Sequence, residues 1–143
     1  MIIGIASDHG GFDLKTYIIN ELTDITFNDL GTHSMDSVHY PDYADKCCQA
    51  VLSEQVNCGI LICGTGIGIS MRANRHSGIR AALVHDEFTA SMAKAHNNAN
   101  ILCLGGRTTS NEDAVRYIQT WLNTNFESGR HQGRIDLIDS PTK

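Results

Sequence analysis

The feature that most constrains this chain is an apolar run that ends on a cysteine and passes directly into alternating glycines. The run covers residues 59–63, and the glycine segment follows it as Gly64-Thr65-Gly66-Ile67-Gly68. A short apolar run predicts a buried strand, and the glycines let backbone N–H groups face one point before a helix begins. The sequence therefore places the Cys63 thiol beside a group of amide donors. The alternative interpretation is a buried, inert cysteine with glycines that only allow close packing.

Five short apolar runs alternate with longer segments of helical spacing. The runs cover residues 2–6, 25–28, 59–63, 79–84 and 100–104, and the apolar helix faces are Phe12/Tyr17/Ile18/Leu22, Tyr43/Cys47/Ala50/Val51, Phe88/Met92/Ala95 and Val115/Ile118/Trp121/Leu122. Uninterrupted apolar strands that alternate with helices are typical of a parallel sheet covered on both faces. We expect an α/β fold, a three-layer α/β/α sandwich with a Rossmann-like five-stranded parallel sheet and a C-terminal helix. Residues 1–143 are expected to form a single domain.

Charge and cysteine usage exclude several classes of protein. Acidic residues outnumber basic ones by 16 to 11 without any basic run, which argues against nucleic-acid and membrane-surface partners. Five cysteines without CxxC pairs predict neither a disulfide framework nor a zinc ribbon, and seven histidines without HxxxH or HExxH spacing predict no metal site. The start of the chain lacks signal-peptide features, and no apolar stretch approaches 18 residues, so we expect a cytoplasmic protein with reduced cysteines.

Polar side chains and glycines follow most of the predicted strands. Ligands of a parallel sheet collect at the carboxyl ends of its strands, so these residues are candidates for one site. They are Ser7-Asp8-His9-Gly10-Gly11, the glycine segment after Cys63, His85-Asp86-Glu87 and Gly105-Gly106-Arg107. Structural loops alone do not require this combination, and the joint pattern favours a functional Cys63 over an inert one.

The glycine segment does not match the common nucleotide-binding motifs. Its spacing is GxGxG rather than GxGxxG, it follows the third predicted strand, and no Lys-Ser or Lys-Thr pair closes it as in a P-loop. Asp86, after the next strand, keeps a non-catalytic nucleotide-binding module open as an alternative. What remains is a site for a smaller anion, either a phosphate or an oxyanion formed during a reaction.

Three further polar features have both a structural and a functional interpretation. Asp8 either caps the first helix or binds a ligand. His96 either lies in a plain helix end or transfers protons, because a helix C-terminus keeps an imidazole basic. Arg130 and Arg134 are four residues apart, and on a helix they form either a solvated face or a phosphate clamp.

Motifs spread over residues 7 to 134 resemble the ribose-5-phosphate isomerase type B family, which is related to galactose-6-phosphate and allose-6-phosphate isomerases. The matching segments are 7–12, 40–44, 62–70 with Ala73-Asn74, 78–81, 96–100, 105–107 and Gly129-Arg130-His131-Gln132-x-Arg134. The resemblance implies an aldose–ketose isomerase without a cofactor. Its substrate would be a small-molecule sugar phosphate, because such an enzyme interconverts D-ribose 5-phosphate and D-ribulose 5-phosphate in the non-oxidative pentose phosphate pathway, through ring opening and an enediolate.

The same resemblance assigns roles to individual residues. Cys63 would move the proton between C1 and C2, Thr65 and His96 would assist ring opening, and the backbone of Gly64, Thr65, Gly66, Ile67 and Gly68 would hold the enediolate oxyanion. Asp8 and Asn97 would bind sugar hydroxyls, and His9, Arg107, Arg130 and Arg134 would hold the phosphate. Asp42 stands where some members have an acid near the cysteine, so it is expected to tune the thiol.

Two finer points also follow from the resemblance. One branch of the family uses a glutamate base at the position of Ile69, so this chain resembles the cysteine-based branch. Family members resemble one another as homodimers with sites completed across the interface, sometimes paired into tetramers, and the same is expected here. A six-carbon aldose phosphate, such as allose 6-phosphate or galactose 6-phosphate, remains an alternative substrate because the sequence does not define the depth of the pocket.

Overall fold

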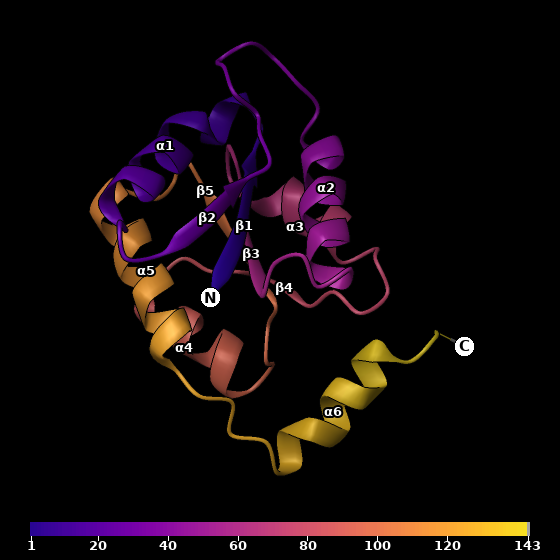
Figure 1. The fold of residues 1–143 in the computed structure, drawn as a ribbon. Helices are drawn as coiled ribbons and strands as arrows, with labels where there is room; N and C mark the ends of the chain where they lie inside the picture. Colours follow the sequence, from indigo (N-terminus) through magenta and orange to yellow (C-terminus); the bar gives the residue numbers. More distant parts are fainter. Residues whose placement is uncertain (143) are drawn as a thin grey trace.

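The computed structural model describes residues 1–142 and contains a five-stranded parallel sheet between two layers of helices (Figure 1). The strands are β1 Ile2–Ser7, β2 Thr26–Asp29, β3 Cys58–Cys63, β4 Ala81–Leu83 and β5 Ile101–Gly105. Their order is β2-β1-β3-β5-β4, and every neighbouring pair is parallel. The expected three-layer sandwich with a five-stranded parallel sheet is confirmed.

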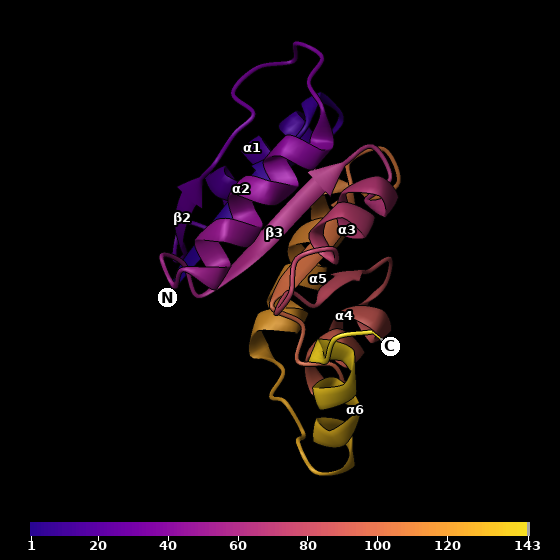
Figure 2. The ribbon, with the colours of Figure 1, turned by 90° about the vertical axis from the view of Figure 1, so that its right-hand side faces the viewer.

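The helices cover both faces of this sheet. They are the short 3₁₀ turn η1 His9–Gly11, α1 Phe12–Glu21, α2 Tyr40–Leu52, α3 Ile67–Ala73, α4 Glu87–Ala95, α5 Asn111–Asn123 and α6 Arg130–Asp139. Helices α1, α4 and α5 lie on one face and α2 and α3 on the other (Figure 1). Helix α6 lies beyond the end of the sheet that is opposite the arrowhead of β3 (Figure 2). Between residues 1 and 142, no helix combines the length and apolarity needed to cross a membrane.

Burial on both faces explains the uninterrupted apolar strands. In β3, Ile60 and Ile62 pack with α1, α4 and α5, whereas Leu61 and Cys63 pack with α2 and α3. Successive side chains of a strand point to opposite faces, so a strand with two covered faces needs apolar residues at every position. Each fully buried Ile or Leu contributes roughly 1.5–3 kcal/mol of transfer free energy, which makes β3 the centre of the core.

Two local expectations are wrong. The strand expected over residues 79–84 is limited to Ala81–Leu83, because β4 is an edge strand with one neighbour and partly exposed side chains. Phe88 was expected on a buried helix face but is 71% exposed. A capping box between Asp86 and Thr89 starts α4 at Glu87. With this starting residue, the alanines of the helix face the core. The outer surface of α4 therefore carries a large apolar side chain.

Candidate active site

Three loops meet at the carboxyl edge of the sheet, where glycines allow their backbones to touch. The N–H of Gly106 donates to the carbonyl of Cys63 at 2.8 Å, and the N–H of Arg107 donates to the carbonyl of Gly64 at 2.9 Å. A Cβ atom on Gly106 would lie only 2.4 Å from the carbonyl oxygen of Gly10. Any side chain at Gly106 would push the loops after β1 and β5 apart, because close-packed backbone cannot absorb such an overlap.

Cys63 is the last residue of β3 and holds its thiol inside this loop cluster. Its Sγ atom accepts the backbone N–H of Gly66 at 3.2 Å, and its residue surface is 5% exposed. Gly66 has φ +78°, a left-handed conformation that glycine adopts without strain, and a Cβ atom there would lie 2.9 Å from the backbone of Leu104. The turn that points an amide at the sulfur therefore depends on glycine.

The other four cysteines have a different environment. Burial raises the pKa of Cys48 to about 12 and that of Cys58 to about 11, and it also raises the pKa values of Cys47 and Cys103. These thiols stay protonated at neutral pH and pack as small apolar groups. All five cysteines are free. Cys63 is the one that ends a strand at a glycine segment.

Asp8 and His9 come from the loop after β1. Oδ1 of Asp8 accepts the N–H groups of Gly10 at 2.9 Å and Gly11 at 3.2 Å, so the side chain does cap the following turn. Nδ1 of His9 accepts the N–H of Val38 at 3.2 Å. A neutral imidazole that accepts at Nδ1 carries its proton on Nε2, so His9 retains an N–H donor for an anion.

Arg107 and Thr65 belong to the same edge, whereas the position of Asp42 gives it no direct link to the thiol. A Cβ atom built on Gly64 would lie 3.1 Å from Nη1 of Arg107, so the guanidinium covers the start of the glycine segment. The Oγ1 atom of Thr65 accepts the N–H of Ile67 at 3.3 Å. Asp42 is exposed in the first turn of α2, and within residues 1–142 no hydrogen bond joins it to Cys63.

His96 and Asn97 lie at the opposite edge of the sheet. They follow α4 and precede β5, so they lie where strands begin, whereas Cys63 lies where β3 ends. The side chain of Arg80, just before β4, donates from Nε to the carbonyl of Asn97 at 3.2 Å. Strand β3 has six residues, and at about 3.3 Å per residue it separates the two edges by roughly 16 Å. Within one chain, His96 and Cys63 therefore cannot reach the same small sugar.

Arg130 and Arg134 share the amino edge with His96. Both are exposed in α6, and the far end of this helix is tied to the sheet by an ion pair of 2.8 Å between Nη1 of Arg80 and Oδ2 of Asp139. Figure 2 shows the helix at the end of the sheet away from the β3 arrowhead. The four side chains expected to hold one phosphate thus divide between the two edges.

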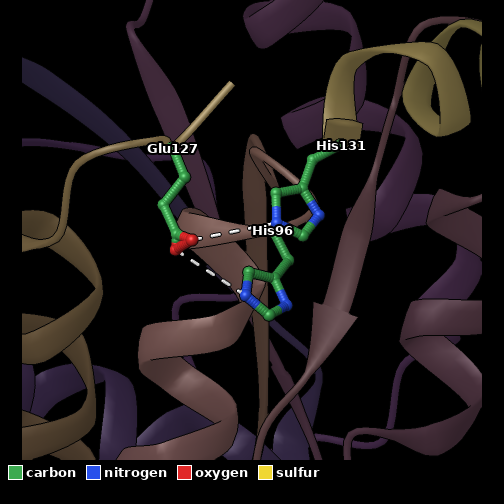
Figure 3. A group of neighbouring side chains, drawn as sticks. All are labelled: His96, Glu127 and His131. Carbon is green, nitrogen blue, oxygen red and sulfur yellow. Dashed lines mark ion pairs between the residues drawn. The ribbon is translucent and has the colours of Figure 1, made fainter. Parts of the chain in front are cut away.

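A cluster of side chains that surrounds His96 was not predicted from the sequence. Oε2 of Glu127 lies 3.7 Å from Nε2 of His96, and Oε1 of Glu127 lies 3.8 Å from Nε2 of His131 (Figure 3). The two imidazole rings stack, with centroids 4.1 Å apart and planes inclined by 17°. Burial lowers the pKa of His131, and the nearby His96 lowers it further. His131 stood in the tail motif between the two arginines, but no spacing rule singles out Glu127.

The cluster offers three potential metal ligands, and their ligand atoms lie within 4.8 Å of one another. An imidazole binds a metal along a lone pair in the plane of its ring, at about 2.0–2.1 Å for zinc. Two nearly parallel rings 4.1 Å apart direct these lone pairs side by side instead of toward one point. This arrangement fits a carboxylate shared by two imidazoles better than a metal site.

Comparisons with known proteins identify the family. The sequence model of the Ribose/Galactose Isomerase family matches residues 3–138. Ribose-5-phosphate isomerase B of Escherichia coli strain K12 is 40% identical over 138 residues, which cover 95% of this chain and 93% of that protein. A ribose 5-phosphate isomerase from Thermotoga maritima, solved by crystallography, is 50% identical with a TM-score of 0.95, covering 96% of this chain and 97% of that one. The crystal structure of ribose-5-phosphate isomerase B from Mycoplasma genitalium with bound ribulose-5-phosphate is 43% identical with a TM-score of 0.91, covering 96% and 93%. This chain belongs to the ribose/galactose isomerase family.

Proposed function

We propose that this chain is an aldose–ketose isomerase that interconverts D-ribose 5-phosphate and D-ribulose 5-phosphate, as a step of the non-oxidative pentose phosphate pathway. The observation that carries the proposal is the Cys63 thiol at the end of β3, hydrogen-bonded within a glycine segment that presents backbone amides. A relative 43% identical over nearly the whole chain binds ribulose-5-phosphate in its crystal structure. The reaction needs a base and oxyanion donors, and a cofactor has no step to perform.

The chemistry assigns a distinct task to each part of the carboxyl edge. Once the sugar ring is open, the Cys63 thiolate removes the proton from C2 of the aldose, and the electron pair forms the enediolate. The amides of residues 64–68 stabilise the developing oxyanion, and each such donor typically lowers the barrier by about 3 kcal/mol. Return of the proton to C1, with transfer of the hydroxyl proton from O2 to O1, gives the ketose. Thr65 assists ring opening beside this segment, and Asp42 tunes the thiol through its charge.

Substrate binding divides between sugar and phosphate. Asp8 and Asn97 bind hydroxyl groups of the sugar. The guanidinium groups of Arg107, Arg130 and Arg134 hold the phosphate together with the Nε2–H donor of His9. Phosphate binding is remote from the reacting carbons, and it supplies energy that fixes C1 and C2 against the base. Charge-assisted hydrogen bonds from arginine suit this task because the guanidinium meets two oxygens at once.

We propose a homodimer in which the carboxyl edge of one subunit faces the amino edge of the other. This assembly would bring His96, Asn97 and α6 of one chain to Cys63 of its partner, and it would bridge the separation of about 16 Å within one chain. Exposed apolar side chains, including Phe88 and Met71 at 71% and 63% exposure, offer the apolar surface that a stable interface buries. Pairing of two dimers into a tetramer is a further proposal from the family resemblance.

The domain organisation and the cellular compartment are also part of the proposal. The family match over residues 3–138 supports one isomerase domain over residues 1–143. Free cysteines throughout the chain favour a reducing compartment, and we therefore place the protein in the cytoplasm.

The proposal is tested by a coupled assay of ribose 5-phosphate conversion with EDTA-treated protein. Wild type is expected to turn over, and Cys63→Ala is expected to lose about 10³-fold or more in kcat while it still binds the sugar phosphate. Cys58→Ala, at the other end of the same strand, is the matched control and keeps its kcat. Full activity in Cys63→Ala would remove Cys63 as the base. An inactive but folded wild type that converts allose 6-phosphate or galactose 6-phosphate would reassign the substrate.

A further inference from the structure

We propose that Glu127 and His131 are positioning residues for His96, and that His96 exchanges its proton with the sugar through Nδ1. The inference rests on the proposed isomerase function. It adds which atom of His96 acts and which two residues hold the ring in place.

Glu127 is placed to fix the Nε2 side of His96. Its carboxylate faces Nε2 of both His96 and His131, at 3.7 and 3.8 Å (Figure 3). A carboxylate attracts a protonated ring nitrogen and repels a lone pair, so it selects the form of each imidazole that carries hydrogen on Nε2. The side chain of Glu127 is 49% exposed, and a small rotation closes either ion-pair distance to a hydrogen bond.

His131 supplies a wall against which His96 stacks. Its side chain is 6% exposed, and its buried Nε2 atom has no hydrogen-bond partner in the described chain, residues 1–142. Desolvation lowers the pKa of this ring, so it stays neutral at neutral pH. Two stacked imidazolium ions at 4.1 Å would repel each other strongly. The two rings are therefore not protonated together, and the stacking sets the plane of the His96 ring.

The remaining nitrogen of His96 is the one available to a ligand. No residue between 1 and 142 makes a hydrogen bond to its Nδ1 atom, and the side chain is 36% exposed. In ring opening, the bond between C1 and the ring oxygen breaks and its electron pair goes to that oxygen, which takes the Nδ1 proton. The C1 hydroxyl loses its proton to water as the carbonyl forms. His96 is left neutral with hydrogen on Nε2, the form that Glu127 stabilises.

The substrate chemistry offers a way to isolate this step. Ribulose 5-phosphate cannot close a five-membered ring, because the oxygen at C5 that would attack the keto group carries the phosphate. The ketose is therefore an open chain, and Cys63 can remove a C1 proton from it without any ring opening. Exchange of that proton with solvent reports on the base alone, whereas conversion of ribose 5-phosphate also requires His96.

The experiment compares Glu127→Gln with wild type in both reactions. We measure kcat/KM for ribose 5-phosphate, and by NMR in D₂O the rate of deuterium entry at C1 of ribulose 5-phosphate. Glu127→Gln is expected to lower the first about 10²-fold and to keep the second within about threefold. Glu127→Asp keeps the carboxylate and is expected to recover part of the loss. Glu112→Gln, an exposed glutamate on α5, is the matched control and changes neither rate.

The tautomer of His96 is measured directly by ¹⁵N–¹H spectroscopy of the neutral ring. Wild type is expected to show hydrogen on Nε2, and Glu127→Gln is expected to show a mixture of the two forms. His131→Phe preserves a stacking ring and is expected to retain most of the conversion, whereas His131→Ala is expected to show the same split as Glu127→Gln.

Several outcomes would overturn the inference. Equal loss of both rates in Glu127→Gln would mean that Glu127 acts on the fold or on Cys63, and no loss in either would mean that it does not position His96. Hydrogen on Nδ1 in wild type would overturn the assignment of the acting nitrogen. A wild type that neither exchanges nor converts would instead contradict the proposed isomerase function, so the two failures are distinguishable.

Discussion

The two edges of the sheet position their side chains in different ways. At the carboxyl edge, the loops after β1, β3 and β5 touch backbone to backbone through glycines, and an amide fixes the sulfur of Cys63. At the amino edge, Nε2 of His96 lies 3.7 Å from the carboxylate of Glu127, and its ring stacks on that of His131 with centroids 4.1 Å apart. The first arrangement consists of direct backbone contacts between loops, and the second of side chains that lie beyond hydrogen-bond distance of one another. Under the proposed mechanism, neither edge of one chain holds all the groups that the isomerase reaction needs.

The largest effect is expected when a different edge is disabled in each of the two subunits of a dimer. Cys63→Ala and His96→Ala are each expected to be nearly inactive alone. When they are co-expressed and the mixed dimers form at random, about a quarter of wild-type activity should return, because half of the dimers are mixed and each has one intact site. Mixed dimers purified through two different tags should show about half of wild-type activity, because each has one intact site of two.

The matched control for that experiment pairs two lesions on the same edge. Co-expression of Cys63→Ala with Thr65→Ala leaves every site of the mixed dimers with one lesion, so no activity above the average of the two parent variants is expected. Verified mixed dimers of Cys63→Ala and His96→Ala that stay inactive would contradict a site shared between the two edges.

A smaller effect is expected from substitution of the arginines that are proposed to bind the phosphate, one at each edge. Arg107→Ala and Arg134→Ala each remove a charged hydrogen-bond donor worth roughly 1.5–3 kcal/mol, so KM for ribose 5-phosphate should rise about 10- to 100-fold. The assay is the same coupled conversion, with exposed Gln132→Ala on α6 as the control. A rise for Arg107 alone would mean that α6 does not reach the phosphate.

The smallest effect concerns Asp45, which lies outside both edges. It accepts hydrogen bonds from Nε and Nη2 of Arg72, both at 2.9 Å, and it meets Nε2 of His76 at 2.7 Å. The hydrogen bond from Arg72, followed by that from His76, lowers the pKa of Asp45 from its usual 3.8 to about 2. A folded-state pKa below the unfolded value stabilises the fold above about pH 4, and the gain is lost as pH falls toward 2.

Asp45→Asn should therefore lower the free energy of unfolding at pH 7 by about 1 kcal/mol, once screening at the half-exposed Arg72 is allowed for. The difference between wild type and variant should shrink at pH 3. Urea denaturation at both pH values measures it, and kcat should not change. A fall in kcat would show that this cluster supports one of the two edges after all.

Much of the carboxyl edge could be predicted from the sequence, because its function resides in short segments that follow strands. Cys63 and Gly64 are adjacent, and the parallel sheet places Arg107 beside them. The amino edge could not be predicted in the same way, since His96 is distant in sequence from Glu127 and His131, and Glu127 lies in the loop before α6. The exposure of Phe88 was also not predicted. The spacing of apolar residues indicates a helix, but it does not say which side of that helix faces the core unless the N-cap residue is known.

The glycine contacts also constrain how a site of this kind can diverge toward longer sugars. Replacement of Gly106 would drive a Cβ atom to 2.4 Å from the carbonyl oxygen of Gly10, and replacement of Gly68 would drive one to 2.5 Å from the ring of Tyr40. Substitution at Gly106 or Gly68 would therefore shift the atoms that surround the proposed base. New substrate range is more accessible at the exposed side chains of α6, where substitutions meet little resistance from neighbours.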